Sequence, residues 1–516
     1  MQKNLVLAVV LSSLVYIGWY SYMEKKFPAQ PKTAAAQQQA ASPATSAPSA
    51  SSPAQVPAAQ PVSADLKKDT VSIKAGKAEF VFYSGAAAMK SVVYQGPVAP
   101  VELIPDQETG FFASSLPGAF KLKAKTADSL EFEASPQPGL VVTKKFTFSP
   151  DNSLNSLSIT ASNNSSKPQI LPAWELSIGP GLGTVKSEEK ENPKLWKAEY
   201  TYKEEGRKHP TIKDLKDLKD EPARADWVWA GLNNRYFLTA LTGDGLAGIR
   251  PVRREAMIKE HKAPLLALPV PAAELRAGEK RTWEAQFYMG PKNYAKLQAL
   301  GHGLDRSVDF GFFSPLAKLA NKAIVYFHKL TGNYGAAIII LSLIIQLMLT
   351  PLSFKSFKAM AVMKKIQPEM QAIQKKYKDD PKRMNQEVMD LYKRHGTNPL
   401  GGCLPMLLQI PVFFSLFTAL RNSWDLHGAP FIFWIKDLSA KDPFYVLPLV
   451  MGGIMFLQQN LSPQTGDPSQ AAMMKWMPVI FTFMFLTFPS GLVLYWLINS
   501  TWGFAQTMYL QKTMNK

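Results

Sequence analysis

At 516 residues the chain is longer than one ordinary domain, and a formal net charge of +18 with 46% apolar residues leaves two broad classes, nucleic-acid binders and membrane proteins. The apolar residues are concentrated in the last third, so we expect a membrane protein whose basic loops lie beside anionic lipid. No interleaving of aromatic and basic residues typical of a nucleic-acid module is visible. One cysteine, scattered histidines and no phosphate-binding loop give no reason to expect a disulfide framework, metal site, cofactor or enzyme activity.

The N-terminal residues 1–27 are predicted to form a transmembrane signal anchor. Their apolar run is followed by Glu24-Lys25-Lys26 rather than by a small-x-small cleavage site, which disfavours the alternative of a cleaved secretory signal. Residues 28–64 are almost entirely Ala, Pro, Gln and Ser, and they cannot bury a core. We therefore expect a disordered linker there.

Residues 65–300 are predicted to form a large all-β sandwich domain, because short segments of period two are separated by Gly, Pro, Asn and Asp clusters. The expected strands are 70–74, 78–83, 130–133, 141–148, 157–160 and 283–288. The charged stretch 213–220 is expected to be a solvated loop. Trp227, Trp229 and Tyr236 are candidates for a sugar or peptide site, although core packing explains them better.

Residues 310–330 return to helical spacing, and we expect an amphipathic helix lying on the membrane surface. Its predicted apolar face consists of Leu316, Leu319, Ala320, Ala323 and Phe327.

Residues 334–352 form an uncharged stretch of about nineteen residues, long enough to cross a hydrocarbon core of roughly 30 Å. Ser342 and Gln346 interrupt it four residues apart, on one face of the helix. Because an amide facing lipid is costly, that face should meet protein or a wet cavity. Interhelical packing and a functional polar site remain equally good explanations at this point.

Residues 353–398 are predicted to form a cytoplasmic helical hairpin, because they carry eleven lysines and arginines against five acids. The two arms, separated by Asp379-Asp380-Pro381, have apolar seams suited to a short antiparallel coiled coil. Four further spans are expected at 399–421, 444–461, 475–489 and 491–511. The fifth span is short for a bilayer, which implies either local thinning or a span that ends inside the leaflet. Six spans place both termini in the cytoplasm and the sandwich outside.

The chain resembles the YidC family of bacterial membrane protein insertases (YidC/Oxa/Alb), in the form found in double-membrane bacteria. The resemblance covers essentially the whole chain, and four motifs carry it: Val308-Asp-Phe-Gly-Phe-Phe-Ser, Asn398-Pro-Leu-Gly-Gly-Cys-Leu-Pro, Ala429-Pro-Phe-Ile-Phe-Trp-Ile-Lys-Asp-Leu-Ser and Phe488-Pro-Ser-Gly-Leu-Val-Leu-Tyr-Trp. It implies a polytopic α-helical inner-membrane protein with a five-helix core around a hydrophilic groove. Implied partners are newly made membrane proteins, the Sec translocon and membrane lipids, with nucleic acid met only through ribosome contact.

The resemblance also implies which residues contact substrate. The expected groove residues are Ser342, Gln346, Gln409, Ile410, Phe413, Tyr495 and Trp496, and the expected groove mouth and hairpin residues are Lys355, Lys358, Lys364 and Lys365. Where the family usually carries a groove arginine, this sequence has Gln346. We therefore expect hydration to act inside the groove and any charge attraction to act at its entrance.

Two alternatives belong to other classes. A small-solute transporter would use Ser342, Gln346 and Gln409 as a midplane site, but no acid suited to ion coupling lies in the spans and no inverted repeat is visible. A periplasmic binding module on a membrane anchor would need one span rather than six.

Overall fold

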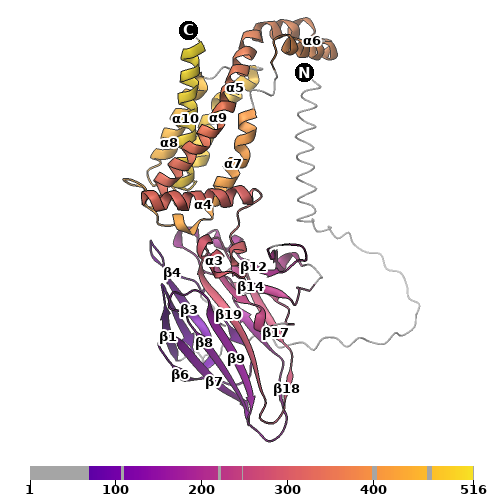
Figure 1. Cartoon of the computed structure of the whole chain (residues 1–516), viewed down its shortest axis with the longest axis vertical. Helices are drawn as coiled ribbons and strands as arrows, with labels where there is room; N and C mark the ends of the chain where they lie inside the picture. The colour runs from indigo at the N-terminus through magenta and orange to yellow at the C-terminus, as the bar shows by residue number, and fades with distance from the viewer. Residues whose placement is uncertain are drawn as a thin grey trace, which may run out of the picture.

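The computed structural model describes residues 69–105, 110–207, 209–218, 222–246, 248–397, 404–461 and 468–514, with the side chains of 404–406, 468–474 and 514 left out. The predicted anchor (1–27) and linker (28–64) lie outside these residues, as does Cys403. Figure 1 shows a β-rich domain at one end and a group of long helices at the other.

The β-rich domain is organised around one large antiparallel sheet. Among the described residues this sheet has nine strands, in the order β13 (Thr211–Asp214), β12 (Lys197–Tyr202), β14 (Trp227–Asn233), β15 (Phe237–Thr242), β19 (Lys280–Pro291), β9 (Asn155–Asn163), β8 (Leu140–Thr147), β7 (Ser129–Gln137) and β6 (Lys121–Lys125). Among the described residues, one four-stranded sheet has the order β1 (Thr70–Ala75), β2 (Ala78–Tyr83), β3 (Ala88–Gln95), β4 (Pro100–Glu102). A second four-stranded sheet has the order β16 (Val252–Ile258), β17 (His261–Val270), β11 (Trp174–Ile178), β5 (Ala113–Ser114). The strands β10 (Gln169–Leu171) and β18 (Ala273–Leu275) form a two-stranded sheet.

The smaller four-stranded sheets pack against the large one through aromatic side chains. Phe82 on β2 meets Phe146 on β8 with ring centroids 4.7 Å apart, and Trp174 on β11 meets Trp283 on β19 at 5.5 Å. Alternate residues are buried along β8, so its period-two sequence gives one buried face, whereas every residue of β11 is buried.

All six predicted strand segments fall on observed strands, within one residue at the end of β8. The prediction of a solvated loop at 213–220 is wrong for its first part. Residues up to Asp214 extend the edge strand β13, and Leu215 is buried in the core. Trp227, Trp229 and Tyr236 are also buried, which supports packing rather than an exposed ligand site.

The helices are α2 (Asn192–Leu195), α3 (Tyr294–Leu300), α4 (Ser314–Thr331), α5 (Tyr334–Lys376), α6 (Pro381–Arg394), α7 (Leu404–Arg421), α8 (Val446–Leu461), α9 (Pro468–Phe485) and α10 (Ser490–Met514). Figure 1 shows α4 lying crosswise between the β-rich domain and the upright helices, with α6 at the far end. Of the described helices, α5 alone is long and apolar enough to cross a membrane by length and composition; Leu407–Arg421, Val446–Leu461 and Lys475–Phe485 are shorter apolar helices.

Two helices differ from the sequence prediction. The predicted span 334–352 and the first hairpin arm form one continuous helix, α5, with Pro351 and Pro368 inside it. Helix α9 begins at Pro468, before the predicted start of the fifth span at 475, and ends at Phe485. Its apolar part, Lys475–Phe485, is short, and a fifth span too short for a bilayer stays a prediction.

Only a narrow face of helix α4 is buried against the rest of the protein. Its buried residues are Ala317, Ala320, Asn321 and Ile324, whereas Leu316 and Leu319 of the predicted apolar face are 38% and 63% exposed. The predicted face is therefore divided: small residues contact the protein, and the leucines remain available to another apolar environment.

Lys144 is the most unusual residue of the β-rich core. It occupies an inward position on β8, is fully buried, and donates a hydrogen bond to the backbone oxygen of Phe112. Its ammonium lies 5.5 Å from the ring centroid of Phe146. Burial lowers the pKa of Lys144 to about 7.

Replacing this lysine by an apolar residue should stabilise the domain. Between pH 7 and about 10.5 the unfolded chain keeps a proton on Lys144 that the folded chain has released, so wild-type stability should rise with pH across this window. Lys144→Met should add on the order of 2 kcal/mol to the free energy of unfolding at pH 7, the lost hydrogen bond offsetting part of the gain, and should flatten the pH slope. Thermal unfolding of the full chain at pH 7 and 9.5 measures both effects.

The matched control is Lys145→Met, because Lys145 is exposed on the other face of the same strand. Identical pH slopes for wild type and Lys144→Met would contradict the assignment.

Candidate functional site

One face of α10 carries polar side chains through an otherwise apolar group of helices. Tyr495, Asn499, Trp502 and Gln506 are spaced four, three and four residues apart, which aligns them on one side of the helix. Tyr495 is 1% exposed and Gln506 is 9% exposed. Buried polar groups need hydrogen-bond partners, so this face determines what packs against it.

The part of this face nearer the start of α10 is bonded to α7 and α5. Gln409 Nε2 on α7 donates to Tyr495 Oη at 2.7 Å. Gln346 Nε2 on α5 donates to Asn499 Oδ1, also at 2.7 Å. The Nδ2 donor of Asn499 is buried and has no hydrogen-bond partner among the described residues. An amide NH2 group without a partner has two N–H donors that can bond a water molecule or the backbone oxygen of a passing chain.

The part nearer the C-terminal end of α10 is bonded to Thr350 on α5, one turn beyond Gln346. Thr350 Oγ1 donates to the backbone oxygen of Gln346 at 2.7 Å and accepts from Gln506 Nε2 at 2.8 Å and Trp502 Nε1 at 3.3 Å. We call this set the polar seam; its members are Gln346, Thr350, Gln409, Tyr495, Asn499, Trp502 and Gln506.

An aromatic wall lies beside the polar seam. Phe413 on α7 meets Trp496 on α10 edge to face, with ring centroids 5.0 Å apart, and Phe481 on α9 stacks on Trp496 at 5.7 Å. Ile410, one turn before Phe413, is 42% exposed. The structure therefore brings five of the predicted groove residues into the polar seam and the aromatic wall: Gln346, Gln409, Phe413, Tyr495 and Trp496.

Ser342 does not join them. It is 1% exposed, and its Oγ donates to the backbone oxygen of Ile338 in its own helix at 2.7 Å. No other hydrogen bond of Ser342 is found among the described residues, so the expectation that it faces the wall stays a prediction.

The predicted basic residues lie beyond the seam on α5. Lys355, Lys358, Lys364 and Lys365 are all exposed. Lys355 follows Gln346 by nine residues, about 14 Å along the helix. Arg421 lies at the opposite end of α7, with its guanidinium 5.4 Å from the ring centroid of Phe417. No described lysine or arginine is bonded to Gln346, so the seam at this level is uncharged.

A loop between α7 and α8 closes the end of the core nearest the β-rich domain. The amides of Ser490 and Gly491, at the start of α10, donate to the backbone oxygens of Ala440 and Leu438 at 2.7 and 2.9 Å. The buried carboxylate of Asp442 accepts from Trp434 Nε1 at 3.0 Å and from the backbone amide of Leu447 at 2.7 Å. This network ties the loop to α8 and α10 at once.

Sequence reasoning missed Asn499, Thr350, Trp502 and Gln506. The four-three-four spacing on α10 was a usable signal for three of them, but the hydrophobicity of residues 491–511 obscured it. Thr350 gave no signal, because threonine is common in membrane helices.

Gln346 and Asn499 should be energetically coupled. Gln346→Leu and Asn499→Leu each leave a partner amide unpaired in an apolar setting, at a cost of about 0.5–2 kcal/mol. The double variant removes both amides, so its loss should be smaller than the sum of the single losses. Thermal unfolding of the purified full chain in detergent measures the stability losses of the two single variants and the double variant, which together form a double-mutant cycle. Ile344→Leu, on the exposed side of α5, is the control; strictly additive losses would show that the bond contributes nothing.

Comparison with known proteins places this arrangement in context. Residues 58–320 match the family model described as YidC periplasmic domain, and residues 326–516 match the model described as 60Kd inner membrane protein. The membrane protein insertase YidC of Endomicrobium trichonymphae is 37% identical over 99% of this chain and 98% of its own. That of Pelobacter propionicus is 35% identical over the whole of both chains. A solved active YidC insertase with its first transmembrane domain resolved is 18% identical, covers 88% of this chain and 95% of its own, and has a TM-score of 0.39.

Proposed function

Because the chain belongs to the YidC family of membrane protein insertases, we propose that it inserts and folds integral membrane proteins without enzymatic chemistry. It is a membrane protein with a periplasmic domain rich in β-sheet and a helical core. The observation that carries the mechanism is the polar seam beside an apolar wall. A solute transporter is not favoured, since Ser342 is bonded within its own helix and the full-length relatives are named insertases.

The proposed topology has six spans in the inner membrane. The spans are 1–27, α5 up to residue 352, α7, α8, α9 and α10, with both termini in the cytoplasm. Side chains on the outside of these helices support it: Leu347, Met348, Phe414, Leu449 and Phe483 are 49–76% exposed, which suits lipid and not water. The β-rich domain would then form a periplasmic sandwich, and α4 would lie on the membrane surface with Leu316 and Leu319 in lipid.

The proposed mechanism lowers the cost of moving polar chain across hydrocarbon. A polar tail crossing about 30 Å of lipid loses its hydrogen bonds to water. The polar seam offers substitute partners, because Asn499 and Gln346 can both donate and accept. The substrate's apolar segment would follow Ile410, Phe413 and Trp496 into lipid, where partition supplies the driving force.

The basic hairpin is proposed to admit substrates from the cytoplasm. Its arms pack through a small cluster of Ile366, Leu391 and Tyr392, flanked by Met370 and Val388. Since α5 is continuous from the core into the first arm, the exposed lysines 355, 358, 364 and 365 lie on the same helix as Gln346. They can attract acidic tails and contact the ribosome or anionic lipid. Cooperation with the Sec translocon is proposed for larger substrates.

The central test is genetic. Depleting the protein should block insertion of a short two-span reporter, and the intact chain should restore it. A reporter that inserts equally well after depletion would reject the proposed function.

Substitutions of Gln346 should reveal how the seam acts. Gln346→Leu removes hydrogen bonding and should slow insertion several-fold, most for substrates with long polar tails. Gln346→Arg should be tolerated, whereas Gln346→Glu should selectively impair acidic tails by repulsion at low dielectric. Protease protection of reporters with neutral and acidic tails measures the series. Ser342→Ala is the matched control on the same helix, and equal rates for all variants would limit Gln346 to packing.

Removing the hairpin should abolish insertion without unfolding the core, because the hairpin has its own apolar cluster. Replacing Lys364–Lys393 by a short Gly/Ser bridge should leave membrane-embedded protein at the wild-type level but reduce reporter insertion at least tenfold. Immunoblotting of membranes and the reporter assay separate the two effects. Normal insertion by this variant would refute the proposed role.

A further inference from the structure

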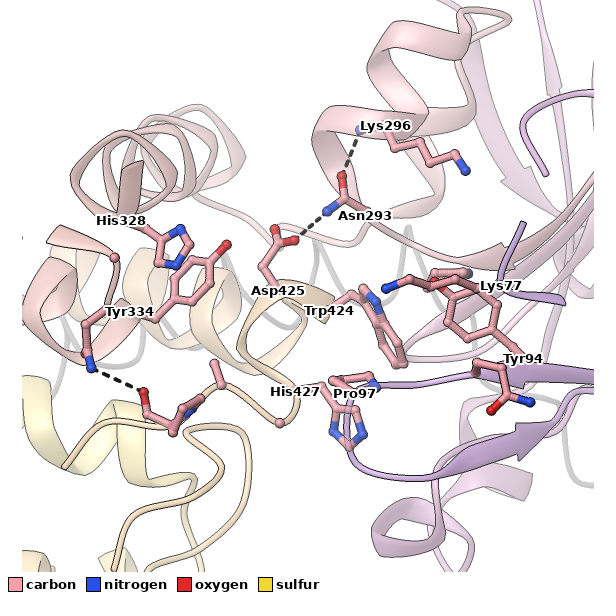
Figure 2. Close-up of a pocket in the computed structure, with 17 residues that line it drawn as sticks. Lys77, Tyr94, Pro97, Asn293, Lys296, His328, Tyr334, Trp424, Asp425 and His427 are labelled. Carbon is pink, nitrogen blue, oxygen red and sulfur yellow. Dashed lines mark hydrogen bonds between the residues drawn. The ribbon is translucent and has the colours of Figure 1, made fainter. Parts of the chain in front are cut away.

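A pocket of about 570 Å³ lies where the β-rich domain meets the helices (Figure 2). Five separate segments line it: the β1–β2 turn, the end of β3, α3, the α4–α5 turn and the loop after α7. The residues on which the argument depends are Lys77, Lys296, His328, Tyr334, Trp424 and Asp425. None of them belongs to the polar seam.

Asp425 gives the pocket a carboxylate with an incomplete set of partners. It accepts a hydrogen bond from Asn293 Nδ2, and no lysine or arginine pairs with it among the described residues. Burial raises the pKa of Asp425, with the Asn293 bond opposing that rise. Figure 2 shows the Tyr334 hydroxyl directed towards this carboxylate, with His328 stacked on the Tyr334 ring at 3.7 Å. A carboxylate bordered by aromatic rings is a good environment for an organic ammonium.

Two lysines supply positive charge on the side of the β-rich domain. Lys77 is exposed in the turn after Gly76, whose φ of +54° makes this turn tight, and no described residue forms an ion pair with it. Lys296 Nζ donates to the backbone oxygens of Asp151 and Asn152, both at 3.1 Å, which leaves one of its three donors. The pocket therefore presents both a carboxylate and cations, which suits a ligand that carries both charges.

Apolar side chains mark the neighbourhood of the pocket as membrane-facing. Leu330 is 67% exposed just before the α4–α5 turn, and Ile432 and Phe433 are 50% and 77% exposed in the loop beside it. Asn333 Nδ2 joins the two segments by donating to the backbone oxygen of Phe431 at 2.9 Å. Under the topology proposed above, on which this inference rests, these side chains enter the periplasmic leaflet.

We propose that this pocket binds the headgroup of a zwitterionic aminophospholipid of the phosphatidylethanolamine type from the periplasmic leaflet. The ammonium bonds Asp425 beside Tyr334, the phosphodiester meets Lys77 and Lys296, and the acyl chains extend past Leu330 and Phe433. Such a lipid bridges the β-rich domain and the α4–α5 turn. It thereby fixes the orientation of the periplasmic domain on the membrane.

The test compares lipids that differ in one charged group. Full-length protein is reconstituted in nanodiscs of phosphatidylcholine with either phosphatidylethanolamine or phosphatidylglycerol, released into detergent, and its retained lipids are counted by native mass spectrometry. All three lipids carry the phosphate, but phosphatidylethanolamine alone carries an ammonium with N–H donors. Wild type should retain it at least about fivefold over the other two, since charge-assisted bonds are at stake.

The variants separate the two halves of the site. Asp425→Asn keeps an oxygen for Asn293 but removes the charge, and should reduce the phosphatidylethanolamine preference to within about twofold. Lys77→Gln should lower retention of all three lipids, whereas Lys74→Gln, exposed on the other side of the same turn, should retain the wild-type pattern. Free glycerophosphoethanolamine should not compete at concentrations where the lipid is retained.

Several outcomes would overturn the proposal. They are equal retention of the three lipids by wild type, wild-type retention by both Asp425→Asn and Lys77→Gln, or full competition by the soluble headgroup, which would assign the pocket to a small solute. Because lipid retention is measured without any substrate, this result is independent of whether the protein inserts the reporter.

Discussion

The polar face of α10 is the constraint on which the helical core depends. Amide and hydroxyl groups cannot be left unpaired among apolar helices, so α5 and α7 must present acceptors and donors at matching heights. Gln346 and Thr350 do so from α5, and Gln409 does so from α7. Once these bonds are made, Trp496, the residue after Tyr495, is fixed against Phe413. The same turn of α10 thus positions both the polar seam and the apolar wall.

The loop after α7 supplies a second constraint, because it couples this core to the β-rich domain. Trp424 is 9% exposed and packs among Tyr94 and Phe237 of the domain, with ring centroids 6.0 and 5.0 Å away. Further along the same loop, the backbone oxygens of Leu438 and Ala440 accept hydrogen bonds from the start of α10. The loop therefore closes one end of the core and anchors the β-rich domain. The pocket lined by Trp424 and Asp425 lies beside it.

Hydrophobic periodicity in the sequence predicted the positions of strands and helices, which depend mainly on nearby residues. The period-two segments became strands because each has one buried face, and the helical segments were located to within several residues. The hairpin boundary at 353 was drawn from charge, but charge does not end a helix. Helix α5 continues through Pro351 and Pro368 to Lys376, although each proline removes a backbone hydrogen bond and crowds the carbonyl four residues earlier. Gln346 and Gln409 stood out as amides in apolar runs. Their partners and the pocket between the β-rich domain and the helices both depend on contacts between distant segments, which no local pattern records.

In the proposed mechanism, Gln346, which we expect at the position of the family's groove arginine, acts through its bond to Asn499. An arginine has donors but no acceptor, so it holds a positive charge that must be balanced by water or substrate. Gln346 instead shares its donor with Asn499, and its uncharged amide can exchange that bond for one to a passing backbone at little cost. In the proposed mechanism, attraction of acidic tails then belongs to the exposed lysines of α5, about 14 Å away and beyond. In that mechanism, capture and passage are separated along a single continuous helix, with positive charge at the groove entrance and neutral amides inside the groove.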